Sequence, residues 1–272
     1  MLRKALLLTT AVLGLASLAP LQAQQLAQSQ DWCREQRWNN DRYGVCEVRQ
    51  YTLMAGAGAL SIDAAPNGGI QVTGGPRGDV FIEARVVATA DNEARAKEIA
   101  SGVRIDAVSD KVTADGPSGL GRHESWHVSY RVAVPTQTSL QLKSSNGGIS
   151  VADVEGRIEA RTVNGGVKFT NLAGEVMGRT SNGGVEIDLN GSTWVGAGLD
   201  VETSNGGVTL NLPEHYNAEL ETRTVNGGLN IDFPVTVQGD LTGKRGLNTT
   251  LGSGGPLVRV RTTNGGVRIS KR

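Results

Sequence analysis

The sequence predicts an all-β protein, a single-chain β-solenoid or β-roll, on two observations. A nine-residue unit occurs five times almost unchanged, as RTVNGGVKF, RTSNGGVEI, ETSNGGVTL, RTVNGGLNI and RTTNGGVRI, starting at residues 161, 179, 202, 223 and 261. Glycine is abundant, with 37 residues in 272, whereas aromatic residues make up only 4%. A short repeated unit with small turn residues and few large side chains is typical of stacked coils, each packed on its neighbours.

The first 23 residues are expected to be a cleaved signal peptide. Arg3 and Lys4 form a basic start, residues 5–19 are apolar, and Ala23 is a small residue at the cleavage point. The alternative is an uncleaved membrane anchor, but the apolar run is shorter than the ~20 residues of a spanning helix. We therefore expect a periplasmic or extracellular protein, cleaved near Ala23, that does not span the membrane afterwards.

Residues 24–50 are predicted to form an N-terminal segment held by a Cys33–Cys46 disulfide. These are the only two cysteines of the chain. In an exported protein such a pair is more often a disulfide than a metal site, because two thiolates do not complete a tetrahedral zinc shell. The cross-link should stabilise the segment by about 3 kcal/mol in the chain-entropy model.

Residues 51–272 are predicted to be one β-solenoid domain, in which residues 51–139 cap the first coil. The cap sequence alternates between strand patterns and contains one helix at about 91–101, with Asp91 as its N-cap and Gly102 at its end. Such a cap would cover the bare strand edges of the first coil.

Residues 140–272 are predicted to be the regular repeats. From Asn146 on, Asn-Gly-Gly recurs at intervals of 18, 18, 23, 21 and 38 residues, and residues 241–250 resemble a degenerate copy that would divide the longest interval. Apolar and polar residues alternate on both sides of each Asn, which predicts a strand, a corner and a second strand. A meander of antiparallel hairpins with Asn-Gly turns is the alternative. The predicted structural corners are Asn146, Asn164, Asn182, Asn205, Asn226 and Asn264.

The Asn-Gly-Gly motif is expected to have a structural role rather than to form a ligand-binding loop. Glycine would supply positive φ at the corner, and Asn tolerates the left-handed region better than other residues. The Asn side chains are expected to point inward and to bond the Asn of the next coil, as in the side-chain ladders of stacked β-structure.

The stretch SLQLKSSNGGISVADVEGRIEARTVNGGVKFTNLAGEV resembles the bacterial putative-adhesin domain of unknown function, a family of strand repeats in exported proteins. The resemblance covers roughly residues 50–270. It is carried by Leu-x-Leu, a small polar residue, Asn-Gly, apolar-x-apolar and a Gly before the next coil. It implies a β-solenoid in the cell envelope. The family has no established catalytic residues, so none can be transferred to this chain.

The sequence predicts no catalytic residue, no metal site and no cofactor. Residues 123–127, HESWH, match the H-E-x-x-H pattern of zinc proteases, but the alternation that follows predicts a strand. On a strand the two histidines would lie about 13 Å apart, too far to share one zinc ion. His215 lies in a loop without a nucleophile partner. Glu186, Asp188 and Asp232 are outward acids, which leaves a carbohydrate-active β-helix enzyme acting on an acidic polysaccharide as the alternative.

A column of mostly basic side chains, three residues before each Asn, is expected to face outward. It is either part of a solvated sheet face with crossed ion pairs or a strip that binds an anionic envelope polymer or a partner protein. The candidate binding residues are Lys143, Arg161, Arg179, Arg223 and Arg261, with Glu202 as the acidic exception.

The function expected from the sequence is that of an exported, non-enzymatic repeat protein of the cell envelope, which presents a solenoid surface for binding or adhesion. A purely structural spacer is a further alternative. The formal net charge of zero and the export signal argue against nucleic acid as a partner.

Overall fold

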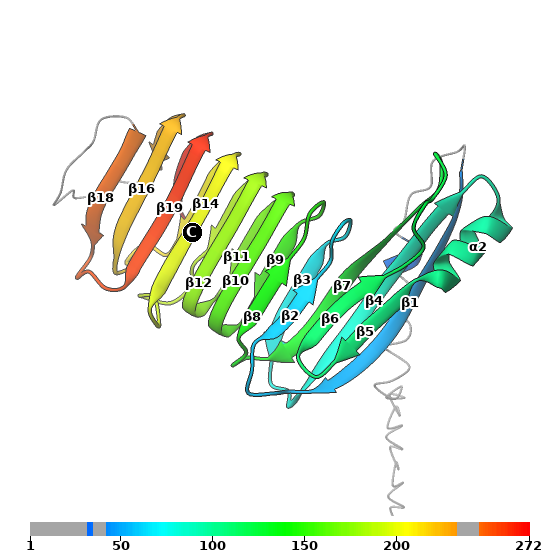
Figure 1. Ribbon diagram of the computed structural model, residues 1–272. Helices are drawn as coiled ribbons and strands as arrows, with labels where there is room; N and C mark the ends of the chain where they lie inside the picture. Colours follow the sequence, from blue (N-terminus) through cyan, green and yellow to red (C-terminus); the bar gives the residue numbers. More distant parts are fainter. Residues whose placement is uncertain (1–31, 35–41, 233–244) are drawn as a thin grey trace, which may run out of the picture.

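The computed structural model describes residues 32–34, 42–232 and 245–272. They include two ten-stranded sheets around a main core, and a smaller cluster of buried residues lies under a helix (Figure 1). The first sheet contains, in spatial order, β1 (Tyr43–Met54), β4 (Asp79–Ala90), β7 (Ser125–Pro135), β3 (Ile70–Gly75), β9 (Ile149–Ala152), β11 (Val167–Thr170), β13 (Val185–Asp188), β15 (Val208–Leu212), β20 (Val267–Lys271) and β17 (Leu229–Ile231). The second contains β18 (Gly246–Leu251), β16 (Ala218–Asn226), β19 (Leu257–Asn264), β14 (Gly198–Asn205), β12 (Ala173–Asn182), β10 (Glu155–Asn164), β8 (Leu140–Lys143), β2 (Leu60–Asp63), β6 (Lys111–Asp115) and β5 (Arg104–Val108).

Each coil consists of one strand of the second sheet, an Asn-Gly-Gly connection and one strand of the first sheet. β10, for example, ends at Asn164, and β11 begins at Val167 in the opposite sheet. Neighbouring coils pair in parallel and in register, so that Asn164 lies beside Asn182. The predicted all-β class is confirmed, and the parallel pairing excludes a hairpin meander for these coils.

The core lies between the two sheets and consists of stacked apolar columns. The strand alternation has the predicted phase. The residues six positions before each corner Asn are all buried: Leu140, Ile158, Val176, Leu199, Leu220 and Val258. Large and small residues complement each other between columns, since a Cβ on Gly178 would lie 2.7 Å from the ring of Phe169. Close packing of this kind leaves little room for substitution.

The spatial order of the last three coils differs from their order in the sequence. The coil at Asn264 (β19 and β20) lies between those at Asn205 (β14 and β15) and Asn226 (β16 and β17). β18 pairs antiparallel with β16 at the edge of the second sheet. The expectation that each copy stacks on the next copy in sequence was therefore wrong for these last coils. Of the expected degenerate copy, residues 241–244 lie outside the described residues, and residues 246–250 belong to an antiparallel strand rather than to a coil. A returning edge strand takes the place of that coil.

The first coil, at Asn67, stacks directly on the coil at Asn146 although a long segment separates them in sequence. This inserted segment extends both sheets beyond the first coil, with β7 and β4 in one and β6 and β5 in the other. Its helix α2 (Glu93–Gly102) packs against β4 and β1. The predicted cap residue Asp91 was wrong by one position, because Asn92 accepts the hydrogen bond from the backbone N–H of Arg95.

The N-terminal segment is tied to the first sheet by the predicted disulfide. Cys33 and Cys46 are bonded, with their Cα atoms 5.7 Å apart. Cys46 belongs to β1, which runs across the predicted limit at residue 50. The predicted signal peptide, residues 1–23, lies outside the described residues. Within the part of the chain that the structure describes, no helix has the length and apolar character needed to cross a membrane.

Candidate functional site

The Asn-Gly-Gly connections are tight because backbone passes directly over backbone. The prediction of positive φ was wrong: no residue of these motifs has left-handed backbone, which occurs instead at the opposite corner, at Asp153 and Asn171. The first glycine is required by close approach. A Cβ on Gly165 would lie 2.2 Å from the carbonyl oxygen of Gly147 in the preceding coil.

A buried column of hydroxyl groups satisfies these crowded glycine carbonyls. Each Ser or Thr two positions before a corner Asn donates to the first-glycine carbonyl of the neighbouring coil, at 2.7–2.8 Å. Thr180, for instance, donates to Gly165 and is 4% exposed. The donors are Ser144, Thr162, Thr180, Thr203, Thr224 and Thr262.

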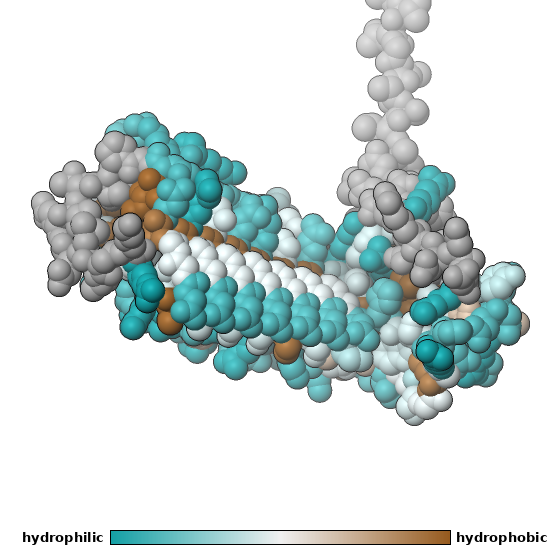
Figure 2. Space-filling model, turned by 90° about the horizontal axis from the view of Figure 1, so that it is seen from above, coloured by the Kyte–Doolittle hydropathy of each residue, from teal (hydrophilic) through white to brown (hydrophobic). Residues whose placement is uncertain are grey.

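The Asn side chains form a continuous ladder, but on the surface rather than inside. Each Asn after Asn67 donates from Nδ2 to Oδ1 of the Asn in the neighbouring coil, at 2.7–2.9 Å, and Asn67 accepts at the end of the ladder. All seven are exposed, so the prediction that they point inward was wrong. Figure 2 shows a hydrophilic row beside a pale row along the solenoid, as expected for Asn beside glycine.

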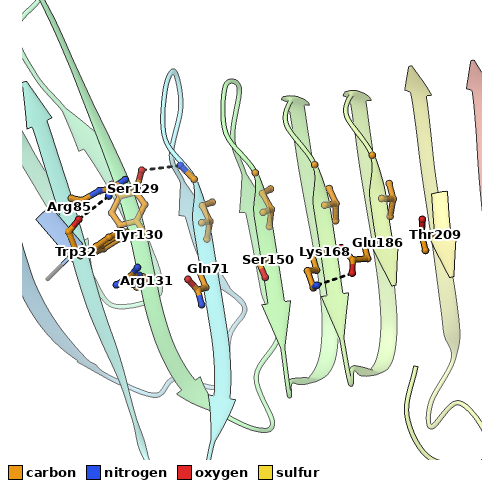
Figure 3. A pocket seen from close by; sticks show the side chains of 18 of the residues that line it. Trp32, Gln71, Arg85, Ser129, Tyr130, Arg131, Ser150, Lys168, Glu186 and Thr209 are labelled. Carbon is orange, nitrogen blue, oxygen red and sulfur yellow. Dashed lines mark hydrogen bonds and ion pairs between the residues drawn. The ribbon is translucent and has the colours of Figure 1, made fainter. Parts of the chain in front are cut away.

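A groove of about 800 Å³ follows the second glycines of these motifs along the outer face of the first sheet. Gly69, Gly148, Gly166, Gly184 and Gly207 line it, one from each successive coil. One wall consists of outward side chains four positions after each Asn, which Figure 3 shows in a row: Gln71, Ser150, Lys168, Glu186 and Thr209.

The groove ends at Trp32, which the Cys33–Cys46 disulfide brings to this face of the sheet. The Arg85 and Arg131 guanidinium carbons lie 4.7 and 4.1 Å from the centre of the Trp32 ring, within the range of cation–π attraction. Arg85 also donates to the Trp32 carbonyl at 3.2 Å. Sequence reasoning missed this end wall, because β1, β4 and β7 bring its residues together only in three dimensions.

The charged side chains that line the groove are mostly basic. They are Arg85, Arg131 and Lys168 against Glu186. The hydrogen bond from Lys168 Nζ to Glu186 Oε1, 2.9 Å long, raises the pKa of Lys168 and keeps it protonated. Among the described lining residues, basic side chains therefore outnumber acidic ones three to one.

The predicted basic column lies on the other sheet, and nearby acids neutralise most of it. Arg179 and Arg261 both pair with Asp200 at 3.2 Å, and Glu202 lies between them at 3.6 and 3.3 Å. This arrangement follows from the coil order, which places Arg261 beside Glu202.

The other three candidates differ in their partners. Lys143 pairs with Asp63 at 3.4 Å, and Arg161 pairs with Glu159. Arg223 has no ion-pair partner among the described residues. The column therefore resembles a solvated face with crossed ion pairs more than a uniform basic strip.

Two of the acids considered for an enzyme approach the same lysine, because Lys168 Nζ lies 2.9 Å from Glu186 Oε1 and 3.8 Å from Asp188 Oδ2. Asp232 directly follows β17, three strands from β13, and forms an ion pair with Arg268 of β20 at 3.3 Å. Asp188, expected to face outward, is only 8% exposed and accepts a 2.8 Å hydrogen bond from Asn211. The two carboxylates that lie near each other are therefore both ion-paired with Lys168, and Asp232 lies apart from them.

The H-E-x-x-H residues open a strand, as predicted. His123 and Glu124 precede β7, and His127 lies within it. The pKa of Glu124 is lowered to about 2, first by its hydrogen bond to Arg95 and then by the Gly121 N–H. His123 hydrogen-bonds Asp91 at 2.8 Å, and His215 lies in the loop between β15 and β16. The described residues contain no group of three His, Cys, Asp or Glu side chains that could hold a metal ion.

Comparison with known proteins identifies the family. No curated protein matches the chain. Among solved structures, a putative cell adhesion protein from Clostridium sporogenes shares 12% identity at a TM-score of 0.47, over 83% of this chain and 100% of that one. A putative adhesin from Bacteroides fragilis shares 11% at a TM-score of 0.42, over 84% and 97%. A putative lipid binding protein from Parabacteroides distasonis shares 8% at 0.40, over 84% and 96%. The family model Toastrack DUF4097 matches residues 78–270, and the chain therefore belongs to this family.

Proposed function

We propose that this chain is a non-enzymatic binding protein of the cell envelope, and that the groove on the first sheet is its ligand surface. The observation that carries the proposal is the groove itself, about 800 Å³ in volume and formed by five successive coils. Its volume falls within the range of ligand sites in proteins. Because its floor is regular β-structure, a ligand would find it already formed, which lowers the entropy cost of binding.

The surroundings of the ionisable groups support a role without catalysis. Glu186 and Asp188 have hydrogen-bonding partners, and no nucleophile lies in hydrogen-bonding contact with His127 among the described residues. Catalytic acids and bases are usually grouped in one cleft. If purified protein shortened an acidic polysaccharide, and Glu186→Gln stopped the shortening, the enzyme alternative would replace this proposal.

Export through a cleaved signal peptide remains part of the proposal. The Cys33–Cys46 disulfide fits an oxidising compartment. N-terminal sequencing of protein recovered from a secreting host is expected to begin at Gln24. A chain that keeps Met1 would contradict export by cleavage.

The basic column of the second sheet remains the competing binding surface, and one experiment separates the two. The purified chain is titrated with three soluble polymers: polygalacturonate, neutral dextran and poly-glutamate. Ser150→Tyr places a ring in the groove, and Gln141→Tyr places the same ring on the outer face of the second sheet as a matched control.

We expect binding of at least one polymer, weakened by Ser150→Tyr and unchanged by Gln141→Tyr. No binding to any of the three, or binding that Ser150→Tyr leaves intact, would overturn the groove as the ligand surface. Loss of binding in the triple variant Arg161→Glu, Arg179→Glu, Arg223→Glu, but not in Ser150→Tyr, would assign the ligand to the basic column.

A further inference from the structure

The groove contains a row of backbone N–H groups without a hydrogen-bond partner among the described residues. In each coil the first-glycine N–H is used, as in the 3.0 Å bond from Gly165 to the Asn182 carbonyl. The second-glycine carbonyl is also used, as in the 3.0 Å bond from the Val167 N–H to Gly184. The second-glycine N–H remains, and these glycines are exposed. Those in the groove are Gly148, Gly166, Gly184 and Gly207.

The first coil shows what kind of acceptor these N–H groups bind. Gly69 is the equivalent second glycine, and its N–H donates to Ser129 Oγ of β7 at 3.2 Å (Figure 3). Ile70 is in register with Tyr130 on one side and with Ile149 on the other. One residue earlier, Ser129 therefore lies at the position that the second glycine has in every later coil. Glycine has no side chain to cap the next N–H. Water satisfies such an exposed donor until a ligand oxygen replaces it.

The spacing of the donors limits the kind of ligand. Neighbouring coils lie about 4.8 Å apart, so acceptor oxygens should recur at that distance. An extended peptide presents carbonyls on one side only at every second residue, about 6.8 Å apart, and does not match. A chain of sugar rings offers several oxygens on each ring and can place one over each coil.

The charge of the groove limits the ligand further. Among the described residues that line it, the backbone N–H groups, Arg85, Arg131 and Lys168 offer donors, and Glu186 is the one acidic side chain. Carboxylate oxygens accept hydrogen bonds about twice as strong as those of neutral acceptors. We propose that the groove binds a strand of an acidic polysaccharide, whose carboxylate and hydroxyl oxygens accept from the row of glycine N–H groups. This inference depends on the groove being the ligand surface, as proposed above.

Gly148→Ser tests whether the row of N–H groups binds the ligand. The new hydroxyl would accept a hydrogen bond from the Gly166 N–H, as Ser129 Oγ does from the Gly69 N–H. A Cβ on Gly148 meets only the Gly166 carbonyl oxygen within 4 Å, at 3.3 Å, so the coil should fold after a small shift. The matched control is Gly266→Ser, with the same 3.3 Å clearance but outside the groove. We expect Gly148→Ser to weaken polygalacturonate binding by tenfold or more, from the loss of one hydrogen bond to a charged group. Gly266→Ser should change it less than about twofold.

Amide hydrogen exchange of the unmodified chain gives a second readout that needs no variant. Polygalacturonate should slow exchange at the four groove glycines and not at Gly266. Unchanged exchange, or unchanged affinity in a folded Gly148→Ser variant, would refute binding through the row of glycine N–H groups. If poly-glutamate bound as tightly as polygalacturonate or more tightly, the acidic polysaccharide would be refuted as the ligand, and the groove would remain the ligand surface. Binding that Ser150→Tyr does not weaken would refute the groove itself.

Discussion

Thr180→Val tests whether the buried hydroxyl column holds neighbouring coils together. The change keeps the branched shape but removes the hydroxyl that donates to the Gly165 carbonyl at 2.7 Å. That carbonyl cannot turn to water, because a Cβ on Gly183 would lie only 2.1 Å from its oxygen. Leaving a buried acceptor unsatisfied costs about 1–3 kcal/mol. We expect a loss of about 2 kcal/mol, which lowers the Tm of a domain of this size by about 4–8 °C.

Thr222→Val is the matched control, because the chain offers the same substitution where no bond is lost. Thr222 is 3% exposed, and its hydroxyl has no hydrogen-bond partner among the described residues. A buried hydroxyl without a partner is unfavourable, so Val should leave the Tm unchanged or raise it. Thermal unfolding followed by circular dichroism measures both variants. Equal Tm values for Thr180→Val and the unmodified chain, or an equal fall in both variants, would refute the reasoning.

Further expected outcomes concern the corners and the cap. Gly165→Ala should lower the Tm by several degrees more than Gly166→Ala, because its Cβ would lie 2.2 Å from the Gly147 carbonyl oxygen, whereas that of Gly166 clears the nearest carbonyl by 3.2 Å. Burial, and to a lesser extent the nearby Arg85 guanidinium, lowers the pKa of His127. Neutral His127 therefore contributes stability above the unfolded pKa of ~6.5, and this contribution is lost as the pH falls. His127→Gln should therefore flatten the decline of Tm between about pH 7.5 and 5.5, and an unchanged decline would contradict this. Asn164 should deamidate more slowly in the folded chain than in urea, because the N–H of the next residue is hydrogen-bonded; mass spectrometry of the tryptic peptide TVNGGVK measures both rates.

The position of the strands and their buried faces could be predicted because alternation is a local property. Successive side chains of a strand point to opposite faces, so the polar and apolar order around Asn164 fixes which of its neighbours enter the core. The helix, observed at 93–102, could be predicted from its start and end signals, which are also local, with its cap misplaced by one residue. The Asn ladder was predicted correctly, but its exposure was not, because the alternation breaks at the end of the strand, where Val163 and Asn164 are both exposed.

The candidate groove could not be predicted, because its residues come from distant parts of the sequence. Trp32 meets Arg85 and Arg131 only through the disulfide and the pairing of β1, β4 and β7. The second-glycine N–H groups that lack a partner among the described residues have no sequence signal of their own. They become visible through register, which places Ser129 where later coils have glycine.

The sequence by itself determined that this chain winds into coils with Asn-Gly-Gly connections and a thin apolar core. Only the tertiary structure decided the order of those coils, with the copy at Asn264 inserted between Asn205 and Asn226. The physical reason is that every copy presents almost the same residues to its neighbours, so local sequence scarcely distinguishes one stacking partner from another. The choice depends on the connecting segments and on the antiparallel strand β18, whose contacts are long-range.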